Sequence, residues 1–68
     1  MNSSFSENLK SLRKEAELTQ RQLAEKLCTT QRKISYLENG TVEPDLNTLT
    51  QIAKIFNVTT DYLLGLEN

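Results

Sequence analysis

Apolar residues in this chain recur three or four positions apart, in short groups, and this spacing constrains the fold more than any other feature. Such spacing places each group on one face of an α-helix. The chain has 68 residues, which supports one domain, and its two glycines and one proline are too few for the turns of a small β-barrel. We therefore predict an all-α fold, a single domain over residues 1–68 made of five helices.

The first two predicted helices begin at capping boxes, in which a Ser or Thr and a Glu or Gln three residues later satisfy amides at the helix start. Ser4 with Glu7 starts a helix over residues 5–16, and Thr19 with Gln22 starts one that ends near Leu27. The spacing turns the following residues inward: Phe5, Leu9, Leu12 and Ala16 in the first helix, and Leu23, Ala24 and Leu27 in the second.

The other three predicted helices are bounded by caps as well. Thr30 caps residues 31–38, which Asn39-Gly40 ends because glycine adopts the left-handed conformation without a Cβ penalty. Asp45 caps a fourth helix that ends near Asn57, and Thr59 caps a last turn over 60–64. The residues predicted to face the core are Ile34 and Leu37 in the third helix, Leu46, Leu49, Ile52, Ala53 and Phe56 in the fourth, and Leu63 in the last.

The two short helices joined by Cys28-Thr29-Thr30 carry the first functional signal. Neither helix can bury its apolar face alone, so the two must cross and pack on each other. Two helices with a connection of three or four residues form a helix-turn-helix, here about residues 19–38, whose second helix enters the major groove of DNA. Short helix pairs also occur in other small bundles, so the spacing alone is not specific.

Two stretches give a more specific pattern. They are Leu18-Thr19-Gln20-Arg21-Gln22-Leu23-Ala24-Glu25-Lys26-Leu27 and Thr30-Gln31-Arg32-Lys33-Ile34-Ser35-Tyr36-Leu37-Glu38-Asn39-Gly40, and the pattern continues through Pro44, Leu49, Ala53, Val58 and Leu63. Over nearly the whole chain these residues resemble the Cro/CI-type helix-turn-helix domains of phage and bacterial repressors. The resemblance implies a compact five-helix bundle of the lambda-repressor-like type and a sequence-specific DNA-binding transcriptional regulator.

The resemblance also implies which residues touch DNA. It assigns base edges to Gln31, Arg32, Lys33 and Tyr36, and phosphates to Gln20, Arg21, Asn39 and Thr41. Gln can pair bidentately with adenine and Arg with guanine, each contact giving about 1–3 kcal/mol of discrimination. Lys33 is equally suited to a phosphate. Tyr36 is suited to a thymine methyl or the DNA backbone, and also to covering apolar neighbours.

Two further positions follow from the resemblance. The family commonly pairs the Glu of its Glu-Asn-Gly element with an Arg on the first helix, which here implies a structural ion pair between Glu38 and Arg13. Where the family usually has glycine after the second helix, this chain has Cys28. That residue either adopts a positive φ at modest cost or the turn differs. A redox role for Cys28 is the minor alternative.

The last apolar cluster exceeds what a small bundle can bury. Leu63 is expected in the core, and we predict a dimer surface from Tyr62, Leu64 and Leu66. A homodimer on double-stranded DNA predicts an inverted-repeat operator with half-sites about 34 Å apart. We expect a repressor, with activation as an alternative. The rival class is an antitoxin-like or partner-binding interaction module, and a regulatory protein partner fits either reading.

Composition excludes several other activities. With no His and one Cys, the chain has no Cys and His zinc site, no internal disulfide and no His-based nucleophilic site. We expect no metal, cofactor or small-molecule ligand, and no enzyme activity. The segment 1–5 lacks the features of a signal peptide, and no apolar run is long enough to span a bilayer. We therefore expect a cytoplasmic protein without membrane contact.

The net charge of -1 is unevenly distributed. Residues 10–33 carry seven basic and three acidic side chains, a net of +4, whereas residues 34–68 carry one basic and five acidic side chains, a net of -4. The positive part contains the predicted helix-turn-helix. So few basic residues predict weak non-specific DNA binding and an affinity that depends on base contacts and dimerisation.

Overall fold

Residues 3–67 fold into five helices that surround one core. A computed structural model describes residues 3–67, with α1 at Ser3–Glu15, α2 at Gln20–Lys26, α3 at Gln31–Asn39, α4 at Leu46–Phe56 and α5 at Thr60–Leu63. The all-α prediction is confirmed for these residues. The predicted domain limits, 1–68, and part of the N-terminal segment assessed for a signal peptide lie outside the described residues. Between residues 3 and 67, no helix is long and apolar enough to cross a membrane.

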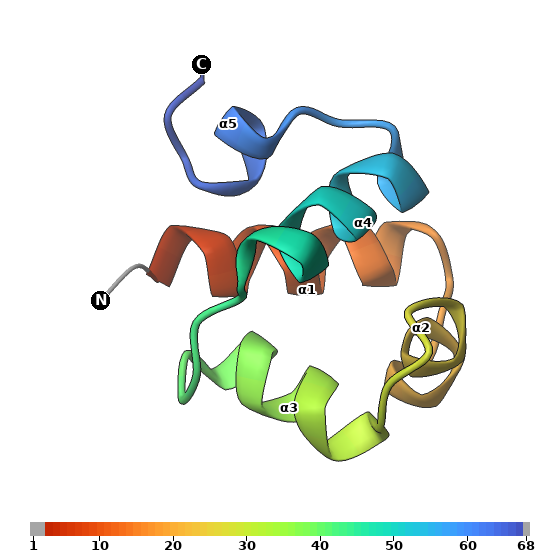
Figure 1. The fold of residues 1–68 in the computed structure, drawn as a ribbon. Coiled ribbons are helices and arrows are strands. Elements are labelled where there is room, and N and C mark those ends of the chain that lie inside the picture. Colours follow the sequence, from red (N-terminus) through yellow and green to blue (C-terminus); the bar gives the residue numbers. More distant parts are fainter. Residues whose placement is uncertain (1–2, 68) are drawn as a thin grey trace.

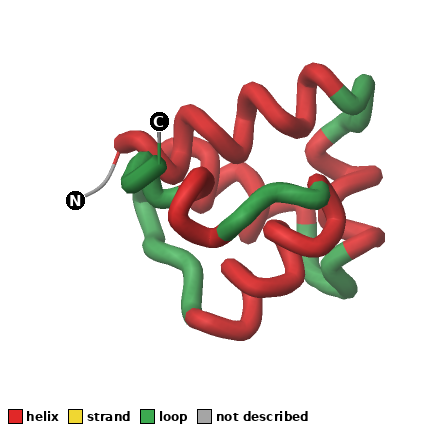
Figure 2. The backbone as a smooth tube through the Cα atoms, turned by 90° about the horizontal axis from the view of Figure 1, so that it is seen from above, coloured by secondary structure: helices red, strands yellow, loops and turns green. Residues whose placement is uncertain are grey.

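α1 crosses the middle of the molecule, with α2 and α3 on one side and α5 on the other (Figure 1). Seen from a perpendicular direction, helices make up most of the trace and short loops join them (Figure 2). The largest fully buried side chains come from every helix: Leu9, Leu23, Ile34, Leu37, Ile52 and Leu63. These side chains belong to one hydrophobic cluster, so the five helices share a single core. Burying each such side chain stabilises a fold by about 1.5–3 kcal/mol.

Helix starts follow the predicted caps from α2 onward. The Thr19 hydroxyl accepts the amide of Gln22 at 3.0 Å, and the Gln22 side chain accepts the amide of Thr19 at 2.8 Å. This is the predicted capping box. The caps predicted at Thr30, Asp45 and Thr59 are also present, each with its side-chain oxygen accepting an amide three residues later.

All five helices end in the same way. The residue after or near each helix end has a positive φ, and the next amide donates to a carbonyl five residues earlier, as in the Schellman motif. The residues with positive φ are Glu17, Cys28, Gly40, Asn57 and Gly65. The amide donors that follow them are Leu18, Thr29, Thr41, Val58 and Leu66. Only two of the five positions are glycine, so the motif forms here with a Cβ present as well.

Three of the turns share one more feature. After Glu17, Cys28 and Asn57, one residue intervenes and then a threonine caps the next helix. The connection from α3 to α4 is longer, because residues 41–44 separate Gly40 from the cap at Asp45. The chain thus has three tight turns of one construction and one open loop.

Three sequence predictions were wrong. Ser4 lies inside α1, which already includes Ser3, so Ser4 is not the residue that starts this helix. Ala16 is exposed because α1 ends at Glu15 and the turn begins there. Leu46 is 82% exposed although its helical phase is that of Leu49 and Ala53, because it is the first residue of α4 and lies at the uncovered start of that helix.

Candidate nucleic-acid interface

A buried ion pair joins α1 to α3. Nε of Arg13 lies 2.6 Å from Oε2 of Glu38, and Nη2 donates to Oε1 at 3.1 Å. Both side chains are sequestered, with 11% of Arg13 and 2% of Glu38 exposed. A bidentate pair fixes orientation as well as distance. It therefore holds the end of α3 against α1 in one geometry, with the two residues that the family resemblance implied.

The same two residues bind a third helix. Nη1 of Arg13 donates to the backbone carbonyl of Leu18 at 2.8 Å, within the turn that leads to α2. Oε1 of Glu38 also accepts the side-chain amide of Gln20, the first residue of α2, at 3.1 Å. The resulting network of Arg13, Glu38 and Gln20 connects α1, α2 and α3, and we call it the ionic network.

The position of Gln20 was not anticipated from the sequence. It was predicted to meet a phosphate, and in the structure its side chain is half-buried and held by Glu38. A glutamine amide has two N–H donors, so the bond to Glu38 leaves a second N–H and the carbonyl oxygen for other partners. The bond spans 18 positions in sequence, and no local pattern signals it.

The first turn of α3 points away from the core. Ile34 and Leu37 are fully buried, and this fixes the rotation of the helix about its axis. Gln31 and Arg32 are consequently exposed, and Tyr36, one turn beyond Arg32, is 40% exposed. These three predicted base-contacting side chains therefore reach solvent from the outer side of α3.

Lys33 has a different environment from its neighbours. Its side chain is half-buried, and its backbone amide donates to the cap Thr30. Hydrogen bonds from Thr48 lower the pKa of Asp45 below its usual value, and the positive charge of Lys33 contributes to that shift. Lys33 thus lies within electrostatic reach of the start of α4.

The other predicted phosphate contacts lie at opposite ends of the helix-turn-helix. Arg21 is exposed in the first turn of α2, while Asn39 ends α3 and Thr41 follows it, both exposed. The turn between the two helices contains Cys28 with a φ of 57°. Of the two alternatives for this residue, the positive φ is therefore correct.

The predicted dimer surface is partly buried within the chain. Leu63 is fully buried, as predicted, and Leu64 is half-buried and packs against the core. Tyr62 is 40% exposed and Leu66 is 72% exposed, so these two side chains make up the apolar surface that remains at this end.

Known proteins share this sequence pattern and fold. A family model described as helix-turn-helix matches residues 9–63. The chain is 48% identical over 60 residues to an uncharacterized HTH-type transcriptional regulator, YqaE, of Bacillus subtilis (strain 168), a match that covers 88% of this chain and 52% of YqaE. It is 40% identical over 62 residues to the HTH-type transcriptional regulator ImmR of the same organism, covering 91% of this chain and 49% of ImmR.

A solved structure shows the same arrangement. The P22 c2 repressor, determined in complex with a synthetic operator, superposes with a TM-score of 0.86 and 25% identity, covering 93% of this chain and 96% of that one. The chain spans about half the length of the Bacillus relatives. The likeness to the P22 repressor, in contrast, extends over nearly all of both chains.

Proposed function

The chain belongs to the helix-turn-helix family, and from this we propose that it is a sequence-specific DNA-binding transcriptional repressor that acts as a homodimer in the cytoplasm. The observation that carries the proposal is the exposed first turn of α3, where Gln31 and Arg32 extend into solvent while Ile34 fixes the helix rotation. The relatives named as transcriptional regulators and the P22 repressor in complex with its operator support it.

In the proposed complex α3 lies in the major groove. Gln31 pairs with an adenine and Arg32 with the guanine beside it, each contact contributing about 1–3 kcal/mol of discrimination. Tyr36 extends the contact one turn further. Lys33, which lies near Asp45, reaches a base edge or a phosphate at the margin of the groove.

Phosphate contacts at both ends of the helix-turn-helix orient α3. From α2, Gln20 and Arg21 contact phosphates on one side of the major groove. Asn39 and Thr41 contact phosphates on the other side. Glu38 orients Gln20 for this contact through their hydrogen bond. Arg13 is engaged with Glu38, so it does not add to the charge available for DNA. The proposed complex therefore has few phosphate contacts, and base contacts contribute a large share of its affinity for DNA.

Tyr62, Leu64 and Leu66 form the proposed dimer surface. A two-fold axis there places two copies of α3 on one face of the DNA, with half-sites about 34 Å apart. Leu66→Asp should shift the protein toward monomer in analytical ultracentrifugation, and Asp61→Asn, an exposed change in α5, serves as the control. A dimer that survives Leu66→Asp contradicts the assignment of this surface.

Selection of bound sequences from a random duplex pool tests the central proposal. The wild-type chain should enrich an inverted repeat whose half-sites contain adjacent A·T and G·C pairs. Arg32→Ala should reduce affinity about 5- to 150-fold and relax the preference at one base pair, as expected for a loss of about 1–3 kcal/mol. Lys54→Ala, which removes an exposed charge from α4, should leave the selected sequences unchanged. Preferences that survive Arg32→Ala would remove it as a base reader.

Salt dependence separates this proposal from a partner-binding module. Phosphate contacts release counterions, so the affinity for duplex must fall steeply as salt rises. Binding that is absent at both low and high salt favours the interaction module, for which a regulatory protein is the partner. A reporter gene placed behind the selected site then distinguishes repression from activation.

A further inference from the structure

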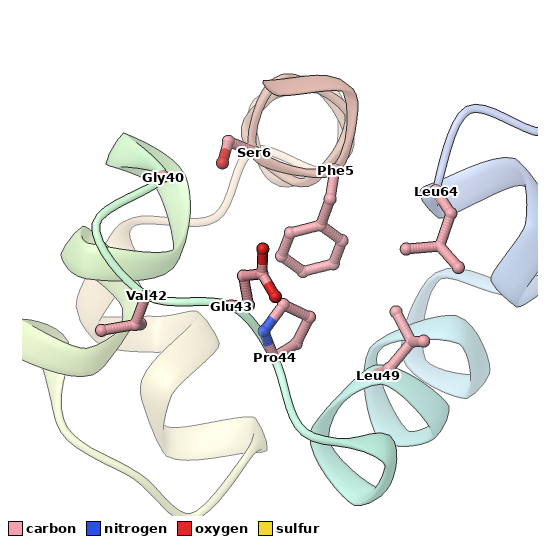
Figure 3. Close-up of a pocket in the computed structure, with 8 residues that line it drawn as sticks. All are labelled: Phe5, Ser6, Gly40, Val42, Glu43, Pro44, Leu49 and Leu64. Carbon is pink, nitrogen blue, oxygen red and sulfur yellow. The ribbon is translucent and has the colours of Figure 1, made fainter. Parts of the chain in front are cut away.

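A cavity of about 250 Å³ lies on the side of the molecule where α1, the 41–44 loop, α4 and the residue after α5 meet. Figure 3 shows the ring of Phe5 directed into this space, with Leu49 and Leu64 on one side and Pro44 on another. The residues that line this cavity are not among the proposed DNA contacts, which include the exposed first turn of α3.

Two polar groups line the otherwise apolar wall. The carboxylate of Glu43 lies beside the ring of Phe5 in this view, and the hydroxyl of Ser6 is nearby (Figure 3). Within residues 3–67, Glu43 has no Lys or Arg within ion-pair distance. An apolar cavity with one unpaired negative group has the chemistry of a site for an apolar cation.

We propose that this cavity binds a small organic cation, a primary amine on a compact apolar body. A cavity of about 150 Å³ accommodates benzene, so a volume of about 250 Å³ accommodates a ring with an aminomethyl group. The ammonium would lie at the exposed Glu43 carboxylate, which attracts a cation, while Phe5, only 3% exposed, belongs to the apolar floor of the cavity. The apolar part would contact Leu49 and Leu64.

The charge of the surrounding chain favours a cationic ligand over an anionic one. Residues 34–68 have a net charge of -4 and contain one basic residue, Lys54. The proposal does not depend on DNA binding, because the cavity residues are not among the proposed DNA contacts.

Three probes of one shape but different charge test the proposal: benzylamine, benzyl alcohol and benzoate. Each is titrated into the isotopically labelled chain at neutral pH while backbone amide shifts are recorded by NMR. Benzylamine should shift amides of the 41–44 loop and the first turn of α1. It should bind about two- to fivefold more tightly than benzyl alcohol, the gain expected from an exposed ion pair. Benzoate should bind more weakly than either.

Two variants make the result specific. Glu43→Gln should bring benzylamine to the affinity of benzyl alcohol, and because Glu43 is exposed this change should leave the fold intact. Glu7→Gln, the same charge change at an exposed position of α1, should retain the preference for benzylamine. Equal affinity for the three probes, shifts outside the cavity, or a preference that persists in Glu43→Gln overturns the proposal.

Discussion

The α1–α3 half and the α4–α5 half of the molecule are held in place by different interactions. In α1–α3, apolar contacts are combined with the ionic network. This network consists of the one ion pair within residues 3–67, Arg13 with Glu38, and of Gln20, whose side-chain amide donates to Glu38. In α4–α5, the buried contacts are Leu49, Ile52, Ala53 and Leu63. α5 is joined to α1 by hydrogen bonds between uncharged groups, since the side-chain amide of Asn8 donates to the carbonyls of Tyr62 and Leu63.

This difference shows where the molecule uses directional interactions. Apolar burial is non-directional and tolerates small rotations of a helix. A bidentate arginine–carboxylate pair does not, because two parallel hydrogen bonds fix the relative orientation of both groups. The ionic network therefore restrains α3, the helix proposed to read DNA, whereas α4 and α5 complete the core without such restraint.

The largest expected effect comes from removing one member of the ion pair. Arg13→Met leaves Glu38 buried without its cation, and we expect the free energy of unfolding to fall by about 3–5 kcal/mol, measured by chemical denaturation. Arg21→Met removes an exposed arginine and should have little effect. A loss below about 1 kcal/mol would show that the pair behaves like a surface pair and would remove the contrast between the halves.

A double variant keeps this prediction measurable even if Arg13→Met does not fold. Combining Arg13→Met with Glu38→Leu removes both charges, so much of the lost stability should return. The double variant should nevertheless bind DNA more weakly than the wild type, because Gln20 loses its partner.

Leu63→Ala, in the other half, should lower the free energy of unfolding by about 2–5 kcal/mol, because it leaves a cavity in the core. The NMR spectrum of its folded fraction should keep the shifts of α3.

A smaller effect is expected at two of the tight turns, one in each half. The turn before α3 has Cys28 at a φ of 57°, and the turn before α5 has Asn57 at 56°. Left-handed backbone is unfavourable for most side chains but tolerated by Asn. Cys28→Gly should therefore raise the free energy of unfolding by about 0.5–1 kcal/mol, whereas Asn57→Gly should change it less. Thermal denaturation of both variants measures the difference, and equal gains at the two turns contradict it.

The smallest effect concerns the caps and is measured as a loss of stability in acid. Hydrogen bonds from Thr48 lower the pKa of Asp45, so the folded chain binds this proton less tightly than the unfolded chain. The contribution of Asp45 to stability is present above the usual aspartate pKa of about 3.9 and is lost as pH falls through the lower folded value. Asp45→Asn should keep the cap but remove this part of the acid sensitivity.

The α3 cap provides the matched control for that measurement. Thr30 accepts an amide as Asp45 does, but it carries no charge. Thr30→Ala should therefore lower the melting temperature by a similar amount at neutral and acidic pH. If Asp45→Asn and the wild type lose stability in parallel between pH 5 and pH 2, Asp45 makes no titratable contribution.

The helices were predictable because their signals are local. Thr19, Thr30, Asp45 and Thr59 cap the amides just beyond them, and the order of residues is enough to identify such caps. Leu46 shows where this reasoning stops. Its helical phase is that of a core residue, but only the placement of the other helices determines that nothing covers the start of α4.

The candidate site was predictable to a similar extent. The exposure of Gln31 and Arg32 follows from the helical phase of Ile34 and from the family resemblance. The bond from Gln20 to Glu38 was not predictable, because it connects residues 18 positions apart through side-chain geometry. The cavity beside Glu43 was missed for the same reason, since its walls come from four separate segments.

The unequal connections between helices determine where the chain can accept an insertion. Each tight turn places a single residue between the positive φ and the next threonine cap, so one added residue would separate the turn from the cap and displace the following helix from its partner. In the 41–44 loop no threonine cap follows within two residues of the positive φ at Gly40, and Glu43, beyond the amides of Thr41 and Val42 that bond to Tyr36, is exposed. The fold should therefore accept an insertion in this loop, between the half with the ionic network and the half without it, and such an insertion would separate the proposed phosphate contact at Thr41 from the cavity residue Glu43.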